Sequence, residues 1–307
     1  MSFESRHLTP VSGRPSTAGI WLEAARPKTL PAAVIPVLVG SALAFRAGAF
    51  DWRPASVCLV FALLVQIGTN FANDYSDFLK GADREDRQGP RRAVASGLVS
   101  ARTMAIATGV TFGAAFLAGL SLVLWGGWVL LPIGILSLLF GWAYTAGPYP
   151  LAYHGLGDVF VFVFFGLVAV GGTAFVMTHR VDAFALLAAT PVGLLAVNIL
   201  VVNNYRDMET DARAGKRTAV VRFGRGVARF QYMLSFAAAF GVPTVLALVR
   251  QSPVLALPLL AVPLALPLVR ELAMSSGGAA LNALLGKTAR ALLVFGVLWA
   301  AALAVTR

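Results

Sequence analysis

The chain has 307 residues, of which 58% are hydrophobic and 13% are charged, and its mean hydropathy is +0.77. This composition excludes a water-soluble globule, which needs more polar surface, and favours a helical membrane bundle, which needs polar side chains only at its ends and in its interior. The formal net charge of +11 does not indicate a nucleic-acid partner, because the basic residues lie between long apolar runs, where they orient membrane proteins.

The first 19 residues are polar, contain Pro and Gly, and lack the apolar core of a signal peptide. They predict a disordered cytoplasmic tail over 1–19, followed by one transmembrane domain over 20–307. The only cysteine, Cys58, lies in an apolar run, so no intrachain disulfide and no cysteine metal site are expected. The three histidines are too scattered along the chain to predict a metal cluster.

Apolar stretches of about 17 to 25 residues are long enough to cross a bilayer as helices. Nine of them follow the tail and predict an all-α bundle of nine transmembrane helices around a central cavity, at 29–46, 54–76, 103–124, 127–144, 156–178, 182–205, 227–249, 252–270 and 288–305. The eighth stretch is rich in proline and is interpreted as a kinked scaffold.

Lys and Arg are distributed unevenly between the two ends of these spans. With the N-terminus inside, the inner segments hold 20 of the 25, and the outer segments hold Arg46, Arg53, Arg180, Arg250 and Arg307. Cytoplasmic loops carry the excess of basic residues. The N-terminus and the charged loops after the second and sixth spans are therefore predicted in the cytoplasm, the C-terminus outside, and the chain as a multi-pass protein of the cell (inner) membrane.

Charge gathers where the second span ends. Five carboxylates lie between Asp74 and Asp86, and Arg91 and Arg92 follow them. If the helix continues through Asp77, three- and four-residue spacings place one polar stripe along it, formed by Asn70, Asn73, Asp74 and Asp77. Ionisable groups at membrane depth cost about 2.5 to 3.5 kcal/mol each, so the stripe should face the interior of the bundle.

A similar stripe ends the sixth span, where Asn203, Asp207 and Asp211 follow at four-residue spacings. The pattern Asn-x-x-x-Asp thus occurs twice, and the even number of spans between its two copies places both on the same side. We interpret this as a weak internal repeat. Repeats in membrane folds tend to place the binding site at their interface.

Two facing acidic stripes are typical of a site for hard cations. Mg²⁺ binds carboxylate oxygens and retains coordination positions for the phosphate oxygens of a substrate. Basic side chains near the acidic stripes could bind a diphosphate, namely Arg91, Arg92, Lys216 and Arg217. Basic residues beside spans are usually topology anchors, and a lone Asp past a helix end is usually solvated. Aligned carboxylates on two helices favour a shared metal site over that simpler interpretation.

The loop from Tyr144 to Asp158, "YTAGPYPLAYHGLGD", contains turn residues, three tyrosines and a carboxylate but no Lys or Arg. It is therefore a candidate to contact an aromatic acceptor through Tyr144 and Asp158. Tyrosines at a membrane interface are also common without any such role.

The stretches "NDYSDFLKGAD" and "NNYRDMETDARAGKRTAVVRFG" together resemble the two signature motifs of the UbiA superfamily of membrane prenyltransferases. The resemblance is closest to its 1,4-dihydroxy-2-naphthoate prenyltransferase branch. Three further stretches fit that branch in the expected order: "RPKTLPAAVIPVLVG", "GPRRAVASGLVS" and "YTAGPYPLAYHGLGDVFVFVFFG". The resemblance implies a nine-helix bundle whose cavity opens sideways to lipid, with both acidic motifs at its cytoplasmic end.

The resemblance also implies roles for individual residues. The first magnesium–diphosphate motif would comprise Asn70, Asn73, Asp74, Asp77 and Asp83, and the second would comprise Asp207 and Asp211 with Asn203 beside them. The catalytic carboxylates would be Asp74, Asp77, Asp207 and Asp211, and Arg92, Lys216 and Lys28 would hold the diphosphate. The last carboxylate of the first motif comes later than in the 4-hydroxybenzoate branch, which favours the naphthoate branch and leaves the ligand role of Asp83 open.

The implied reaction transfers a polyprenyl chain from polyprenyl diphosphate to 1,4-dihydroxy-2-naphthoate, with Mg²⁺ or Mn²⁺, loss of carbon dioxide and diphosphate, and formation of demethylmenaquinol for menaquinone. Three alternatives remain open at this point. They are another aromatic or chlorin acceptor, a cation-coupled transporter, and a non-catalytic lipid-binding protein. A transporter would place its carboxylates near the membrane midplane, whereas these lie at the inner helix ends beside arginines.

Overall fold

The computed structural model describes residues 16–83 and 88–306, and within these ranges the chain is helical with no strand. The predicted tail lies outside the described residues except for its last four positions. Of these, Ser16 caps the first helix by accepting a hydrogen bond from the Gly19 N–H. Glu85 and Asp86 of the first acidic cluster also lie outside the described ranges.

The first half of the chain contains four long or medium helices and a short entry segment. Arg26, with a left-handed φ of 54°, separates α1 from a single turn, η1. The elements are α1 (Thr17–Ala25), η1 (Pro27–Thr29), α2 (Pro31–Arg46), α3 (Trp52–Leu79), α4 (Ala101–Gly126) and α5 (Leu130–Ala143).

The second half begins with the short turn η2 (Leu151–His154) and then continues with helices. A continuous helical rod follows it, made of α6 (Gly157–Val161), the π-helical η3 (Phe162–Val168) and α7 (Ala169–Thr178). The remaining elements are α8 (Ala183–Arg213), α9 (Ala219–Val249), the 3₁₀ segment η4 (Pro253–Ala261), α10 (Val262–Met274) and α11 (Gly278–Val305). The proline-rich stretch thus leaves α-helical geometry, as predicted.

Seven helices in the described ranges are long and apolar enough to cross a membrane, and an eighth span is counted if the pair 17–29 and 31–46, bent by 53°, is taken as one. The chain is therefore a multi-pass membrane protein. The predicted span not counted among these eight is 127–144, which corresponds to α5 and has 14 helical residues. At 1.5 Å per residue it is about 21 Å long, less than the hydrocarbon thickness of about 30 Å, so the expected total of nine is not confirmed.

The core lies around α8, which packs against α9, α11 and η3. Small residues allow close approach in two places. A Cβ on Gly40 would lie 2.5 Å from the Val170 carbonyl oxygen, and one on Gly166 would lie 2.8 Å from the Gly193 Cα. Such backbone contacts replace the hydrophobic driving force that is missing between helices in lipid.

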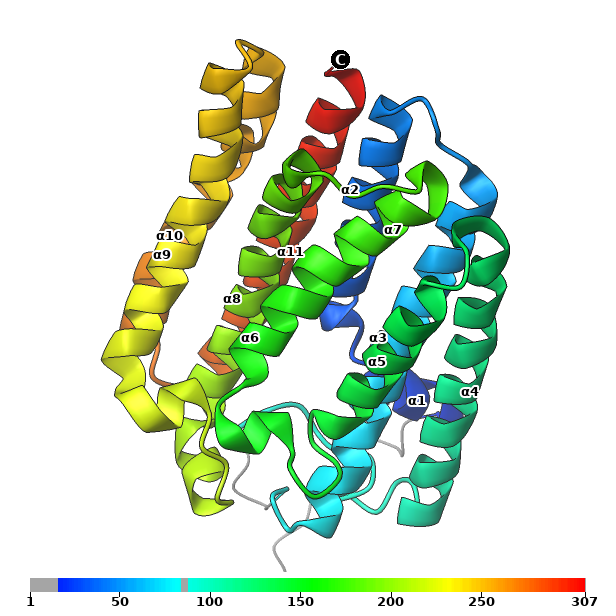
Figure 1. Cartoon of the computed structure of the whole chain (residues 1–307). Coiled ribbons are helices and arrows are strands. Elements are labelled where there is room, and N and C mark those ends of the chain that lie inside the picture. The colour runs from blue at the N-terminus through cyan, green and yellow to red at the C-terminus, as the bar shows by residue number, and fades with distance from the viewer. Residues whose placement is uncertain (1–15, 84–87, 307) are drawn as a thin grey trace, which may run out of the picture.

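The charged ends of α3 and α8 lie at the same end of the bundle as the turn between α5 and α6 (Figure 1). The C-terminal end of α11 lies at the opposite end (Figure 1). α3 continues through Asp77 to Leu79, as the first stripe required, and α8 continues eight residues beyond the predicted boundary at 205. A prediction from hydropathy ends each span near its first charged residues. The observed helices continue past that point, and the charged side chains are therefore held on helical backbone.

Candidate active site

A cavity of about 300 Å³ lies between α2, α3, α5, the α6–α7 rod and α8. Its wall is polar at the end where α3 and α8 terminate and apolar beyond. The predicted site residues that line it are Asn70, Asn73, Asp77, Arg92, Tyr144, Asn203, Asp207, Asp211 and Lys216. The structure therefore brings most of both motifs to one cavity, although they are more than 100 residues apart in the sequence.

Asp77 is the centre of the polar end. Its Oδ2 accepts hydrogen bonds from Arg92 Nη2 at 3.0 Å and from Lys216 Nζ at 2.9 Å, and its Oδ1 accepts from the Tyr153 hydroxyl at 3.1 Å. Asp77 is 1% exposed. Because Arg92 follows α3 and Lys216 follows α8, this one carboxylate joins the loops of both motifs.

One nitrogen of the Arg92 guanidinium has no hydrogen-bond acceptor among the described residues. Its Nε donates to Asp83 Oδ1 at 3.3 Å, but its Nη1 is buried without an acceptor among the described residues. A buried donor without an acceptor costs about 1 to 3 kcal/mol. Since Arg92 lines the cavity, an anionic group bound there would supply the missing acceptor.

Asp74 was expected to face the cavity with Asp77, but it does not line it. Its two carboxylate oxygens accept hydrogen bonds from the backbone N–H groups of Ala93, at 2.9 Å, and Val94, at 3.1 Å. It lies at the edge of the polar stripe, next to the loop that carries Arg92. In this structure Asp74 therefore positions that loop.

Arg206, on α8, holds the second motif. Its Nε and Nη2 donate to the two carboxylate oxygens of Asp207, at 2.8 and 2.6 Å. Its Nη2 also donates to Asn203 Oδ1, and its Nη1 donates to Asn282 Oδ1 on α11. Bidentate pairs of this kind are strong and directional, so Asp207 is held by a resident cation.

Each charge of the motifs within the cavity wall has an opposite charge nearby. Asp211 Oδ1 lies 3.9 Å from Lys216 Nζ, which also contacts Asp77. A negatively charged substrate and a metal ion entering together would exchange these partners, with cations moving to the substrate and carboxylates to the metal. Such an exchange conserves pairing, which buried charges require.

Besides Asp74, five of the predicted site residues do not line the cavity. The Arg91 guanidinium donates to Glu23 on α1 at 2.8 Å, and the Asp158 carboxylate accepts from Gln231 on α9 at 3.0 Å. Lys28 and Arg217 are exposed. Asp83 Oδ1 accepts a hydrogen bond from Arg92 Nε at 3.3 Å.

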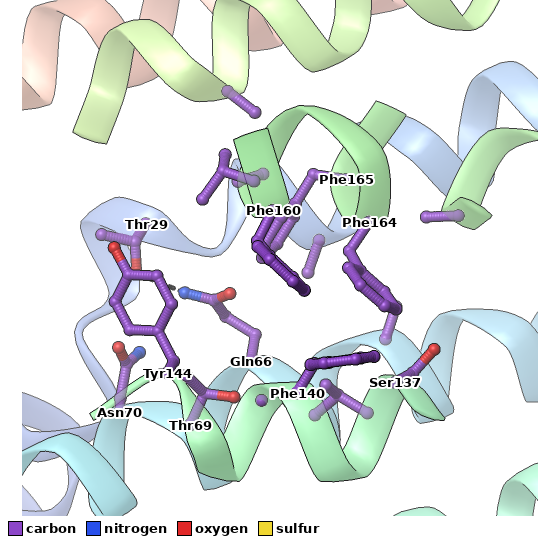
Figure 2. A pocket seen from close by; sticks show the side chains of 18 of the residues that line it. Thr29, Gln66, Thr69, Asn70, Ser137, Phe140, Tyr144, Phe160, Phe164 and Phe165 are labelled. Atoms are coloured by element: carbon purple, nitrogen blue, oxygen red, sulfur yellow. Dashed lines mark hydrogen bonds between the residues drawn. The ribbon is translucent and has the colours of Figure 1, made fainter. Parts of the chain in front are cut away.

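Tyr144 contributes an aromatic ring to the polar end. Figure 2 shows this ring on the same side as Thr29 and Asn70, across from a group of phenylalanines. Two amides are held in place beside it, since Asn73 Oδ1 accepts from the Thr145 hydroxyl at 2.6 Å and Asn70 Nδ2 donates to the Ala25 carbonyl at 3.0 Å.

The apolar half is lined along the α6–α7 rod by two adjacent rows of residues at every fourth position. One row is Phe160, Phe164, Val168, Gly172 and Val176, and the other is Val161, Phe165, Ala169 and Thr173. In an α-helix this spacing would rotate away from the cavity by about 40° per step. The wider π-helical turn of η3 offsets that drift. Phe140 on α5 packs against both Phe160, at 4.9 Å between ring centres, and Phe164, at 5.5 Å (Figure 2).

Several lining or supporting residues were missed in the sequence, including Arg26, Gln66, Tyr153 and Arg206. Arg206 is embedded in "NNYRD", and its position beside Asp207 was the available signal. Arg26 precedes Pro27, which marks a break before the first span. Tyr153 is one of three similar tyrosines in its loop, and the sequence offered no reason to choose it.

Tyr153 lies outside the spans and supports Asp77. Burial and the nearby Asp77 charge raise the pKa of its hydroxyl, so it remains a hydrogen-bond donor. The ring also lies 4.5 Å from Lys80 Nζ and 5.1 Å from Lys216 Nζ. Burial lowers the pKa of Lys80, and Asp77 opposes this shift.

Tyr153→Phe removes one donor from Asp77 and keeps the ring. Hydrogen bonds to charged groups contribute about 1.5 to 3 kcal/mol, so we expect the catalytic rate to fall about tenfold or more. Tyr149→Phe is the matched control, because Tyr149 is exposed and stacks on His154. Steady-state turnover in membranes measures both, and an equal effect in the two variants would refute this role of Tyr153.

The sequence that carries these motifs matches a known protein family. A model of the UbiA prenyltransferase family matches residues 33–278, which span both acidic motifs. The chain belongs to the UbiA prenyltransferase family. The resemblance of the two motifs is thereby confirmed, and membership of the UbiA prenyltransferase family decides for an enzyme over a transporter or a non-catalytic lipid-binding protein.

Curated relatives in the UbiA prenyltransferase family cover most of the chain. It is 40% identical over 284 residues to a protein of Mycobacterium tuberculosis, covering 92% of this chain and 96% of that one. It is 41% identical over 256 residues to a protein of Haemophilus influenzae, covering 79% and 83%. Both are named 1,4-dihydroxy-2-naphthoate octaprenyltransferase.

Solved structures share the UbiA prenyltransferase fold at low sequence identity. A UbiA homologue from Aeropyrum pernix superimposes with a TM-score of 0.68 at 13% identity, covering 89% of this chain and 97% of that one. A UbiA homologue from Archaeoglobus fulgidus, described as bound to DMAPP and Mg²⁺, gives 0.65 at 15% identity, covering 93% and 99%.

Proposed function

We propose that this UbiA-family enzyme transfers a polyprenyl group from polyprenyl diphosphate to 1,4-dihydroxy-2-naphthoate, releasing diphosphate and carbon dioxide and forming demethylmenaquinol for menaquinone. The observation that carries the proposal is one cavity with a cationic, carboxylate-rich mouth and an aromatic interior. The names of relatives about 40% identical over most of the chain support the acceptor.

The polar mouth suits a diphosphate. Arg92 and Lys216 both line it, and Arg92 Nη1 is a buried donor that needs an acceptor. Guanidinium and ammonium groups bind phosphate oxygens with short, charge-assisted hydrogen bonds. In our proposal both cations therefore move from Asp77 to the diphosphate when the substrate binds.

The carboxylates around the mouth suit Mg²⁺, with Mn²⁺ as an alternative, because both metals prefer oxygen ligands. In the described residues no three Asp, Glu, His or Cys side chains form a metal-binding group by themselves. We propose that Asp77, Asp207 and Asp211 hold the metal together with diphosphate oxygens, and that Asp74 and Asp83 support it from behind. The bound metal would supply neutralisation of the departing diphosphate.

The apolar half suits the isoprenoid chain. The aromatic rings of Phe140, Phe160 and Phe164 lie beyond the polar mouth (Figure 2), and an isoprenoid is as apolar as the lipid around the bundle. These side chains exclude water from the carbon that loses the diphosphate, which protects a reactive cation from hydrolysis. An aromatic face also stabilises positive charge by about 0.5 to 2 kcal/mol.

The acceptor ring is proposed to lie near Tyr144, between the amides of the mouth and the phenylalanines. In this branch of chemistry the ring carbon that attacks carries the carboxylate, which then leaves as carbon dioxide. Asp158, which contacts Gln231 outside the cavity, is proposed to orient the start of α6 without touching the acceptor.

We further propose that the chain crosses the cell (inner) membrane nine times and that the short helix α5 is one of these crossings. The distribution of 20 of the 25 Lys and Arg residues to the segments at the acidic end supports a cytoplasmic location for that end. A reporter fused after Arg307 should then behave as extracytoplasmic. Cytoplasmic behaviour of that fusion, with a fusion after Gly215 also cytoplasmic, would contradict the nine-span topology.

The acceptor assignment is tested with membranes containing this chain, an octaprenyl diphosphate and either dihydroxynaphthoate or 4-hydroxybenzoate. We expect prenylated naphthoate product with Mg²⁺ and none after chelation, with recovery when Mg²⁺ is restored. Preferential prenylation of 4-hydroxybenzoate would assign the chain to a different acceptor and leave the metal site standing. Full activity in the presence of chelator would refute the metal assignment.

A further inference from the structure

A second hollow has a volume of about 310 Å³. The segments that form it lie at the end of the bundle opposite the charged ends of α3 and α8 (Figure 1). The hollow is formed where α2 ends and where α7 connects to α8. Its lining includes Arg46, Thr178, Arg180, Asp182 and Phe184. We call this hollow, together with the adjacent Arg250, the distal arginine pocket.

Three guanidinium groups converge on the distal arginine pocket. The Cζ atoms of Arg46 and Arg250 lie 4.2 and 5.2 Å from the centre of the Phe184 ring, and Arg180 lines the same hollow as Arg46. These are three of the five basic residues expected at this end of the chain. Cations usually spread apart, so two guanidinium groups at one phenyl ring, with Arg180 lining the adjoining hollow, favour a bound anion.

In the part of the chain that the structure describes, no carboxylate pairs with this group of arginines. The carboxylate of Asp182, which lines the hollow, accepts from the Ala185 N–H and caps α8. Arg46 and Arg250 lie at helix C-termini, but each such end carries only about half a negative charge.

The surroundings identify the source of the anion. Leu248 and Val249, next to Arg250, are 73% and 72% exposed, and Val181, next to Arg180, is 40% exposed. In a membrane these side chains face acyl chains, so the arginines lie at the depth of the headgroups. Basic pockets between transmembrane helices bind anionic lipid headgroups on the cytoplasmic side of membranes, and the same charge complementarity applies to a headgroup at the opposite side.

We propose that the distal arginine pocket binds the phosphate of an anionic membrane phospholipid. Arg46 donates from its Nε to the Thr306 carbonyl oxygen, at 3.0 Å, at the end of α11. The bound lipid would thus tie together the ends of α2, α9 and α11. It would stabilise the bundle at the end away from the chemistry.

The test measures lipid binding to detergent-purified protein by native mass spectrometry, with phosphatidylglycerol and phosphatidylcholine of identical acyl chains. Wild type should retain phosphatidylglycerol preferentially and unfold at a higher temperature with it. Because each arginine near a lipid surface contributes about a fivefold change in affinity, Arg180→Gln with Arg250→Gln should weaken that binding about 25-fold. Both side chains are exposed, and Arg180→Gln alone provides a milder second variant.

Arg53→Gln is the matched control, because it removes one charge at the same end from an arginine that is paired with Asp51 at 2.7 Å. It should leave phosphatidylglycerol binding unchanged. Equal binding of both lipids by wild type, or equal loss in Arg53→Gln, would overturn the proposed site. Displacement of the lipid by equimolar inorganic phosphate would show a site for the free anion and would overturn the lipid assignment.

Discussion

Asp77→Asn should lower prenyl transfer by at least about 100-fold, the effect typical of removing one element of a preorganised charged site. The substitution keeps the shape of the side chain and removes its charge. Asp77 contacts Arg92, Lys216 and Tyr153 at the same time, so neutralising it releases both cations and removes one proposed metal ligand. Turnover with matched protein levels in membranes is the measurement.

Asp51→Asn controls for the loss of one negative charge, because Asp51 lies at the other end of the bundle and pairs with the exposed Arg53. It should retain wild-type turnover. The unfolding temperature of Asp77→Asn is a second control that separates folding from catalysis. It should stay close to that of wild type if the loss of turnover is catalytic. Near-normal turnover in Asp77→Asn would remove the metal assignment.

Arg92→Ala and Arg91→Ala should differ strongly, although the two arginines are neighbours in the sequence. Arg92 is buried, lines the cavity and contacts Asp77 and Asp83. Truncating one member of a buried charge pair costs about 2 to 5 kcal/mol, so prenyl-diphosphate use should fall at least about 30-fold with any acceptor. The readout is kcat/KM for the prenyl diphosphate at saturating acceptor.

Arg91 contacts Glu23 in an exposed pair, with side chains 44% and 39% accessible. Exposed pairs contribute about 0 to 1 kcal/mol, so Arg91→Ala should change kcat/KM by less than about fivefold. Equal losses in the two variants would indicate that the loop responds to any lost charge, and the assignment of Arg92 to the diphosphate would fail.

The arrangement of helices and the location of the site were largely predictable from the sequence. Apolar length identified the long helices, and Asp77, Asp207 and Asp211, which the sequence analysis assigned to one site, line the same cavity. These predictions succeeded because helical periodicity and the cost of charge in lipid act locally along the chain. The α5 span is the exception in length, because only 14 of the 18 residues of the predicted span 127–144 lie in the helix.

The partners of the charged residues were not predictable. Asp74 and Asp77 are both aspartates and lie three residues apart, yet one accepts hydrogen bonds from the backbone of residues 93–94 and the other lines the cavity. The partner of each carboxylate depends on the conformation of the loop after α3. Helical periodicity does not predict that conformation. The same reason explains why Arg91 and Arg92 were both expected at the site and only one reaches it.

The apparent repeat of Asn-x-x-x-Asp also has different contacts in its two copies. Asp74 accepts from backbone amides, whereas Asp207 accepts from Arg206. The position that corresponds to Arg206 in the first copy holds the neutral Asn73, so similar spacing does not produce similar pairing. The equivalent aspartates of the two motifs therefore have different hydrogen-bond partners.

The most direct test of the proposed reaction follows the carboxyl group of the acceptor. Membranes containing this chain are supplied with Mg²⁺, octaprenyl diphosphate and dihydroxynaphthoate labelled in its carboxyl group, and released carbon dioxide is measured against prenylated product. The proposal predicts that the two form in equal amounts and that both disappear in Asp77→Asn. A prenylated product that retains the label, or release of label without prenylation, would contradict it.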